Sequence, residues 1–468
     1  MENKRGSFTG SLGFVLAAAG SAVGLGNLWR FPYLAAKNGG GIFLLVYIIL
    51  ALTFGFALMT TEIALGRKTQ RSPIGAFQTA DKRFTWLGYL ILIVPVIIFP
   101  YYCVIGGWVT KYAFTYISGN GAAAMDPTGG FFYQAIGLSD TFQAEPLMWF
   151  LLFMVATAVF VYLGVDKGIE KCSKVLMPLL LILVLFIAGY SLTLKNPTNG
   201  VTAIDGLKIY LIPNFEGMTF TRFLHVVLDA MGQLFYSMSL AMGIMITYGS
   251  YTPKKSSLVQ SVNHIELFDT GIALLAGVIM VPVVYCFLGS DGLAQAGPSL
   301  MFVALPQVFS AMGWFGDVIG ALFFILVIFA AITSSISLLE AISSMIMDRF
   351  NISRKVATTI VLVVSLIIGV ITCLGYNLLL VEVDLPNGAK GQQILDILDW
   401  FSNNFIMPIV AFFTCIAAGW FIGTKYICDE VSLNGEKFSR KKLYEIMVKY
   451  VSPVLLLIIF LNGFGVFG

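Results

Sequence analysis

The sequence predicts an all-α polytopic membrane protein with 11 transmembrane helices, and three features of the chain support this prediction. Only 11% of the 468 residues are charged, whereas 58% are hydrophobic, and an ordinary soluble domain carries about 25% charged residues. The apolar residues form stretches of about 20, the length with which a helix crosses a bilayer. Two of the stretches contain interruptions, at 20–27 and 232–243. This composition excludes a soluble enzyme, and the net charge of +3 without a basic run gives no sign of nucleic-acid binding.

The expected helices follow one another as apolar stretches bounded by charged or turn-forming residues. They cover 12–36, 41–66, 86–117, 147–164, 174–194, 223–251, 264–290, 314–347, 356–376, 395–424 and 447–466. The loop 291–313 is rich in Gly and Pro and partly apolar, so we expect it to dip back toward the bundle. No stretch predicts a separate soluble domain, and residues 1–468 are expected to form one transmembrane domain.

The distribution of Lys and Arg predicts the orientation of the chain. Most of the 28 basic residues fall in one set of alternate loops, together with the N-terminus. Cytoplasmic loops of membrane proteins carry this excess. We therefore expect the N-terminus in the cytoplasm and, after an odd number of spans, the C-terminus outside.

The two interruptions predict breaks in the first and sixth spans. Glycine costs about 1 kcal/mol in a helix interior relative to alanine, and Gly20, Gly24 and Gly26 lie within seven residues. Close packing of helices through Gly20-x-x-x-Gly24 is a simpler explanation. However, the interruptions lie five spans apart, as inverted repeats at about 12–194 and 223–424 with an extra helix at about 447–466 would place them. Broken helices in matching halves indicate a transporter's binding site at mid-membrane.

Several motifs carry a family resemblance. The stretch GSAVGLGNLWRFPY at 20–33 resembles the signature of the neurotransmitter:sodium symporter family, and so do 233–251, Ala330-x-x-Thr333-Ser334-Ser335 and Asp399. The chain is similar to the bacterial amino-acid branch, which includes leucine, tyrosine and multi-hydrophobic amino acid transporters. The resemblance implies a leucine-transporter-like fold of 5+5 inverted repeats in a bacterial inner (cell) membrane. It also implies sodium-driven symport by alternating access.

The resemblance further implies two sodium sites, built from the oxygen ligands that this hard cation prefers. The second site takes the carbonyls of Gly20, Val23 and Ala330 and the hydroxyls of Thr333 and Ser334. Those hydroxyls have an alternative, which is to bond back to the preceding turn of their own helix. The first site takes the carbonyl of Ala22, the side chains of Asn27, Ser237 and Asp269, and the carboxylate of the substrate.

Asp269 departs from the family, where asparagine is usual. Chloride-dependent members bind an anion nearby, and Tyr47, Gln233 and Ser237 match that pocket, but Ala273 stands where a further hydroxyl is expected. We expect the Asp269 carboxylate to supply the negative charge, so that transport needs no chloride. Protonation of this aspartate on the return step would give proton antiport. Alternatively, Asp269 is hydrogen-bonded and has no role in transport.

The substrate implied by these residues is a hydrophobic or aromatic L-amino acid. A helix N-terminus attracts a carboxylate, and Gly24 stands where amine transporters of the family place an aspartate. Met242 stands where the leucine transporter has a phenylalanine. Because methionine is slim and flexible, we expect a roomier pocket that adapts to large side chains. The expected pocket consists of Ser21, Ala22, Gly24, Leu25, Gly26, Ile98, Tyr102, Tyr236, Ser237, Ser239, Met242, Ser334 and Leu338.

Charged residues at the ends of the spans are expected to act as gates. By resemblance, Arg30 and Asp399 form the outer pair and Arg5 and Asp348 the inner pair, near Tyr251. Phe8 stands where tryptophan is usual. Glu62 is expected to bind the unwound amides of the sixth span, whereas Glu266 and Glu340 receive no role. Gly168 and Pro178 predict either a hinge or a plain kink in the fifth span.

Other functions are weighed against symport. The chain has only two histidines, His225 and His264, and no metal spacing or nucleophile–base pair, so we expect no enzyme. No repeat of acidic or carbonyl groups indicates a channel. An uncoupled facilitator and a membrane sensor that merely binds amino acids remain the alternatives.

Overall fold

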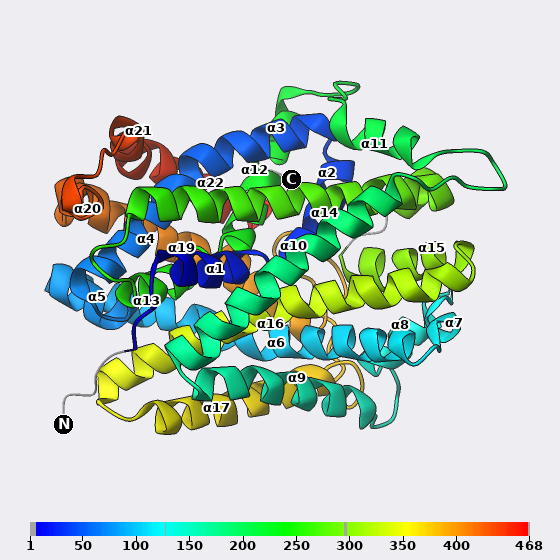
Figure 1. Ribbon diagram of the computed structural model, residues 1–468, viewed down its shortest axis with the longest axis horizontal. Helices are drawn as coiled ribbons and strands as arrows, with labels where there is room; N and C mark the ends of the chain where they lie inside the picture. The colour runs from blue at the N-terminus through cyan, green and yellow to red at the C-terminus, as the bar shows by residue number, and fades with distance from the viewer. Residues whose placement is uncertain (1–5, 127, 294–296, 467–468) are drawn as a thin grey trace.

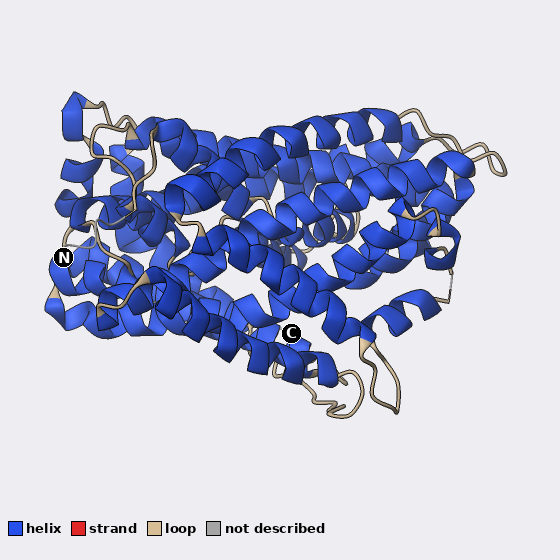
Figure 2. Cartoon of the chain, turned by 60° about the horizontal axis from the view of Figure 1, so that its bottom comes forward, coloured by secondary structure: helices blue, strands red, loops and turns tan. Residues whose placement is uncertain are grey.

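The computed structural model describes residues 6–126, 128–293 and 297–466, and over these residues the protein is helical (Figure 2). Most long helices run along the longest axis of the molecule (Figure 1). The described residues form no β-strand, only isolated bridges such as the one between Gly40 and Pro213. The predicted all-α class is therefore confirmed.

The helices have the following bounds in chain order. They are α1 Ser11–Ala22, α2 Phe31–Lys37, α3 Gly41–Leu50, α4 Phe56–Thr69, α5 Pro73–Ala80, α6 Thr85–Ile117, α7 Gly121–Ala124, α8 Gly130–Ile136, α9 Glu145–Tyr162, α10 Lys171–Ser191, α11 Ala203–Leu211, α12 Phe220–Ser237, α13 Ile244–Ser250, α14 Leu258–Leu293, α15 Leu305–Ala311, α16 Trp314–Phe350, α17 Arg354–Leu374, α18 Ile394–Trp400, α19 Met407–Ile416, α20 Thr424–Val431, α21 Lys441–Ile446 and α22 Ser452–Asn462. Wider π-helical turns at Gly26–Arg30, Ala51–Gly55, Val165–Glu170, Leu300–Ala304, Phe401–Ile406, Ala417–Phe421 and Met447–Val451 extend or join several of them.

The structure supports only some of the 11 predicted membrane spans. Within the described chain, 9 helical stretches are long and apolar enough to cross a membrane, and the bent pair α1 and α2 makes up to 10. The pieces α12 and α13 are not among them, so the predicted count of 11 is not confirmed. The fifth span begins at Val165, earlier than predicted, because Asp166 and Lys167 lie inside its first π-helical turn.

Both predicted interruptions are breaks in helices. α1 ends at Ala22, and the helical segment that resumes at Gly26 is bent from it by 53°. α12 ends at Ser237 and α13 begins at Ile244. Between them, Ser239 and Ala241 adopt left-handed φ values of 52° and 60°, a conformation that costs a non-glycine residue roughly 1–2 kcal/mol.

The two breaks face each other and bond to each other. The Ser239 hydroxyl donates to the Ser21 carbonyl at 3.0 Å and lies 3.0 Å from the Ser21 hydroxyl. Glu62 of α4 accepts the Ala241 amide at 2.8 Å, which is the contact expected of it. Backbone groups freed inside a membrane protein need such partners.

The loop 291–313 dips into the bundle as expected, through the turn Leu300–Ala304 and α15. Phe302 is buried and its ring lies 6.1 Å from that of Trp29, 6.2 Å from that of Trp108 and 5.2 Å from that of Phe132. This aromatic packing closes the molecule near α7, α8 and α15, which lie at one end of the long axis (Figure 1).

The other end of the long axis carries α5, α20 and α21 (Figure 1). Lys68, Arg71, Lys425 and Lys441 belong to the helices and loops there, and we call it the basic end. It is the end predicted to face the cytoplasm, and this orientation stays a prediction.

Candidate functional site

A cavity lies where the two breaks meet. Its volume is only about 20 Å³, far below the roughly 300–1,000 Å³ of small-molecule pockets, so its walls lie close together in this structure. Its lining consists of Ser21, Ala22, Gly24, Gly26, Asn27, Ile98, Tyr102, Tyr236, Ser239, Met242, Ile244, Ser334 and Leu338. The structure therefore brings most of the expected pocket together, from four separate segments of the chain.

The observed lining differs from the expected pocket at four residues. The expected Leu25 and Ser237 do not line the cavity, whereas Asn27 and Ile244 do. Leu25 contributes its amide, which donates to the Tyr102 hydroxyl at 3.4 Å. Ile244 escaped sequence reasoning because it is the first residue of α13, and the sequence did not show where the helix resumes.

Gly24 is packed so closely that any side chain there would force its neighbours to move. A Cβ at this position would lie 2.8 Å from the Ser334 hydroxyl oxygen and 3.2 Å from the Tyr102 hydroxyl oxygen. The sequence lacks the aspartate that amine transporters place at this position, and an aspartate here would also displace these two hydroxyls. The polar groups that remain are uncharged: backbone groups, the Asn27 side chain, and the hydroxyls of Ser21, Tyr102, Tyr236, Ser239 and Ser334.

The residues of the expected second sodium site lie together. The Ser334 hydroxyl donates its single proton across to the Ser21 carbonyl at 3.0 Å and also lies 3.3 Å from the Gly20 carbonyl and 3.5 Å from the Val23 carbonyl. Thr333 instead bonds back to its own helix, with its hydroxyl 3.1 Å from the Ala330 carbonyl. A hydroxyl that donates its proton keeps its lone pairs, so all five oxygens can still turn to a cation. The alternative of back-bonding is thus correct for the Thr333 proton and does not describe Ser334.

Asp269 lies at the expected first sodium site and is fully buried. Its Oδ1 accepts from Asn27 Nδ2 at 2.8 Å and from the Ser237 hydroxyl at 2.5 Å, and its Oδ2 accepts from the Tyr47 hydroxyl at 3.4 Å. Among the described residues no Lys or Arg forms an ion pair with it. A buried carboxylate with neutral partners alone is costly, and a sodium ion would supply the missing positive charge.

The expected anion pocket surrounds the same carboxylate. Tyr47 and Ser237 both contact Asp269, while the Gln233 side chain donates to the Gly26 carbonyl at 2.9 Å and leaves its own Oε1 buried without a partner. Ala273 is buried and adds no hydroxyl. The negative charge at this place is therefore already built into the chain.

The expected outer gate is not a direct ion pair. Within the part of the chain that the structure describes, no N–O distance of 4.0 Å or less joins Arg30 to Asp399. Asp399 instead accepts from the Tyr101 hydroxyl at 3.0 Å and from Asn403 at 2.7 Å. The carboxylate thus has two neutral donors as its direct partners.

The expected inner gate lies at the basic end. Arg5 falls outside the described residues. Asp348 accepts the Ser72 amide at 2.8 Å and lines, with Tyr251 and Arg354, a vestibule of about 890 Å³. Phe8, which stands in the place of tryptophan, is buried with its ring 5.6 Å from that of Tyr248 and 6.2 Å from that of Tyr251.

The two acids that received no role both form ion pairs. Glu340 pairs with Arg354 and accepts from the Tyr251 hydroxyl at 2.6 Å, and it is fully buried. Glu266 pairs with Arg440 at 3.0 Å. An acid within a span was the available signal, because such groups are usually paired, but the sequence did not name the partners.

The fifth span is continuous at its proposed hinge. Gly168 lies in the π-helical turn Val165–Glu170, and Pro178 lies inside α10. Glu170 also accepts the Thr9 amide at 2.8 Å, which joins this turn to the segment before α1. The choice between hinge and kink stays open at this geometry.

Comparison with known proteins adds four matches to this geometry. The model of the sodium:neurotransmitter symporter family matches residues 5–125 and 118–467. An uncharacterised sodium-dependent transporter of Methanocaldococcus jannaschii is 32% identical over 99% of this chain and 91% of its own length. The uncharacterised sodium-dependent transporter YhdH of Bacillus subtilis is 32% identical over 99% of both chains. The crystal structure of MhsT in complex with L-phenylalanine is 35% identical, covers 98% of this chain and 100% of that chain, and has a TM-score of 0.85.

Proposed function

The chain belongs to the sodium:neurotransmitter symporter family, and on that premise we propose that it carries hydrophobic and aromatic L-amino acids into the cell together with sodium. The family is one of sodium-dependent, multi-pass membrane transporters, not of enzymes. The amino-acid class, the two sodium ions and the direction are our proposal.

The observation that carries the amino-acid class is the closed space at Gly24. A substrate with an ammonium group and no carboxylate would need an acid in the cavity, and the described lining contains none. A substrate that brings its own carboxylate can bond to the Tyr102 hydroxyl and balance a sodium ion beside Asn27. The apolar residues Ile98, Met242, Ile244 and Leu338 then suit an apolar or aromatic side chain. The complex of MhsT with L-phenylalanine is consistent with this class.

Sodium coupling follows from shared ligands. If the substrate carboxylate and Asn27 both bind the first ion, each of substrate and ion raises the affinity of the other by the same factor. Entry of one positive charge is favourable by about 2.3 kcal/mol per 100 mV of membrane potential. Two ions therefore supply enough free energy to concentrate an amino acid many-fold.

Chloride independence and proton antiport are proposed from Asp269. Its fixed charge occupies the place where an anion would otherwise be needed, and Ala273 removes a hydroxyl from that place. After sodium leaves, the carboxylate has only neutral partners, so taking up a proton removes an unpaired buried charge.

The test is uptake of radiolabelled L-phenylalanine, L-tryptophan, L-tyrosine and L-leucine into proteoliposomes, with and without an inward sodium gradient. We expect accumulation only with the gradient. Uptake that merely equilibrates would identify an uncoupled facilitator, and binding without uptake would identify a sensor. The proposed placement, in a bacterial inner membrane with a cytoplasmic N-terminus, is tested by protease access to the basic end in oriented vesicles.

A further inference from the structure

One face of α4 follows the whole of α13, the helical piece after the second break. Glu62 holds the Ala241 amide before α13 begins. One turn further on, a Cβ on Gly66 would lie 2.8 Å from the carbonyl carbon of Ile246. From the other side, a Cβ on Gly249 would lie 3.0 Å from Cα of Ile63. The two backbones are thus in direct contact, with glycine on each side.

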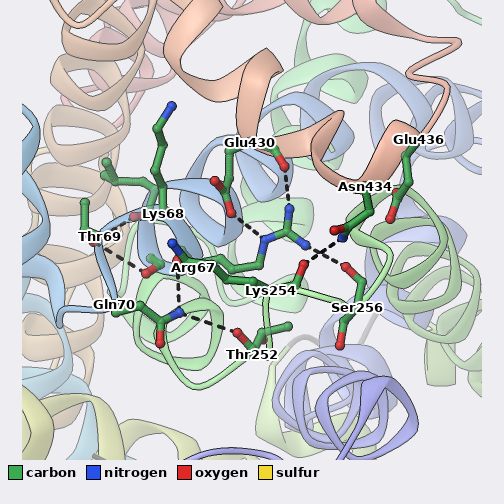
Figure 3. Close-up of polar contacts among 12 residues, drawn as sticks. Arg67, Lys68, Thr69, Gln70, Thr252, Lys254, Ser256, Glu430, Asn434 and Glu436 are labelled. Carbon is green, nitrogen blue, oxygen red and sulfur yellow. Dashed lines mark hydrogen bonds and ion pairs between the residues drawn. The ribbon is translucent and has the colours of Figure 1, made fainter.

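At the end of this face, Arg67 is fully buried at the basic end of the molecule (Figure 3). Its Nε donates to Glu430 Oε1 at 2.7 Å and its Nη1 to the Ser256 carbonyl at 2.6 Å. Its Nη2 donates to the Glu430 carbonyl. The three bonds use the forked shape of the guanidinium, which lysine cannot reproduce.

The acceptors belong to two segments that come from distant parts of the chain. Ser256 lies in the loop 251–257, which joins α13 to α14, and Glu430 lies in the segment 424–436, which contains α20. A further bond joins the same two segments, since Asn434 donates to the Lys254 carbonyl at 2.8 Å (Figure 3). Gln70, the residue that follows α4, donates to the Thr252 carbonyl at 3.5 Å and so joins the loop to α4. The loop 251–257 is therefore held between α4 and the segment 424–436.

This arrangement affects the cavity because α13 connects the cavity to the loop 251–257. The residues Met242 and Ile244 line the cavity at the start of α13, and the loop 251–257 follows its end. α13 has only seven residues, and a piece this short has little helical stability of its own. Its position depends on contacts outside itself, and Arg67 supplies the charged contact at its far end.

We propose that Arg67, paired with Glu430, is a positioning residue for transport: it seats α13 on α4 and thereby fixes Met242 and Ile244 at the cavity. The effect on the cavity is tested by amino-acid binding, and only this part of the proposal rests on the transport function proposed above. Removal of one member of a buried ion pair leaves the other charge unpaired, so the effect should appear in variants of either residue.

The first experiment measures hydrogen exchange by mass spectrometry in the full-length protein, with Arg67→Gln, Glu430→Gln and Arg83→Gln. Arg83 is the matched control, because it pairs with Asp81 at 2.7 Å but is 67% exposed. We expect exchange in 244–257 to become at least about tenfold faster in the first two variants, with α6 unchanged, because the change is local. Exchange that becomes faster throughout the protein, or exchange in 244–257 that does not change from the wild type, would overturn the proposal.

The second experiment measures sodium-dependent binding of L-phenylalanine to the same purified proteins. We expect at least about a tenfold rise in Kd for Arg67→Gln, a factor of ten being about 1.4 kcal/mol, and none for Arg83→Gln. Should Arg67→Gln fail to fold, Glu430→Gln carries both tests, since glutamine keeps an acceptor for the Arg67 Nε. Faster exchange in 244–257 with an unchanged Kd would refute the link to the cavity. If the wild type binds no amino acid, the proposed function fails, and the exchange experiment still decides whether Arg67 seats α13.

Discussion

Replacing Gly24 by alanine is expected to weaken amino-acid binding by about 10- to 1,600-fold. The added Cβ would lie 2.8 Å from the Ser334 hydroxyl and 3.2 Å from the Tyr102 hydroxyl, so both must move. Overpacking of this kind costs about 1–3 kcal/mol. Each neighbour is already bonded, Ser334 to the Ser21 carbonyl and Tyr102 to the Leu25 amide, and a lost bond costs about 0.5–1.5 kcal/mol. A total of about 1.5–4.5 kcal/mol gives the stated range at 1.4 kcal/mol per factor of ten.

The assay is equilibrium binding of radiolabelled L-phenylalanine to the purified protein at a fixed sodium concentration. The matched control is Gly189→Ala, because Gly189 lies in α10 and a Cβ there meets nothing within 4 Å. We expect the control to bind like the wild type and to melt at the same temperature or slightly higher, since alanine is the better helix former. If Gly24→Ala also binds like the wild type while remaining folded, the cavity is not the substrate site.

Three other changes test the ion sites and the fifth span. Replacement of chloride by gluconate should leave wild-type uptake unchanged, whereas Asp269→Asn should lose uptake without chloride; a wild type that needs chloride would contradict the role given to this carboxylate. Thr333→Val should raise the sodium concentration for half-maximal uptake roughly tenfold, as loss of one ligand costs about 1–3 kcal/mol, whereas Thr333→Ser keeps the hydroxyl and should change it little. Equal effects of the two would argue against a hydroxyl ligand. Pro178→Ala restores a backbone donor inside α10 and should slow sodium release on the basic side, and an unchanged rate would leave Pro178 as a plain kink.

The parts of the fold that depend on local composition were predictable from the sequence. Apolar length fixed most spans to within a few residues, and the glycines at 20–26 and the polar run at 232–243 indicated both breaks. The family motif then indicated which residues meet at the cavity. The fifth span begins at Val165 and the last at Lys441, each earlier than the predicted 174 and 447. Both errors arose because charged residues such as Asp166 and Lys441 are tolerated in the first turn of a membrane helix, where the sequence suggests a loop.

The ionic contacts could not be predicted in the same way. Arg67 pairs with Glu430, which lies 363 residues away along the chain, and Glu266 pairs with Arg440, which lies 174 residues away. Asp399 takes Tyr101 and Asn403 although Arg30 was expected. Pairing of this kind depends on how side chains approach one another after the helices have packed, and a single sequence contains no signal for the register of one helix against another.

The two breaks depend on each other, and this dependence explains why ions and substrate can act on both at once. Ser239 and Ala241 hold left-handed conformations that would relax in isolation. They are retained because Ser239 bonds to the Ser21 carbonyl in the first break and Ala241 bonds to Glu62. Straightening either helix alone would leave a buried polar group of the other unpaired, at about 1–3 kcal/mol. A ligand that bonds to the first break therefore changes the free energy of the second, and substrate and sodium need not touch every residue that they move.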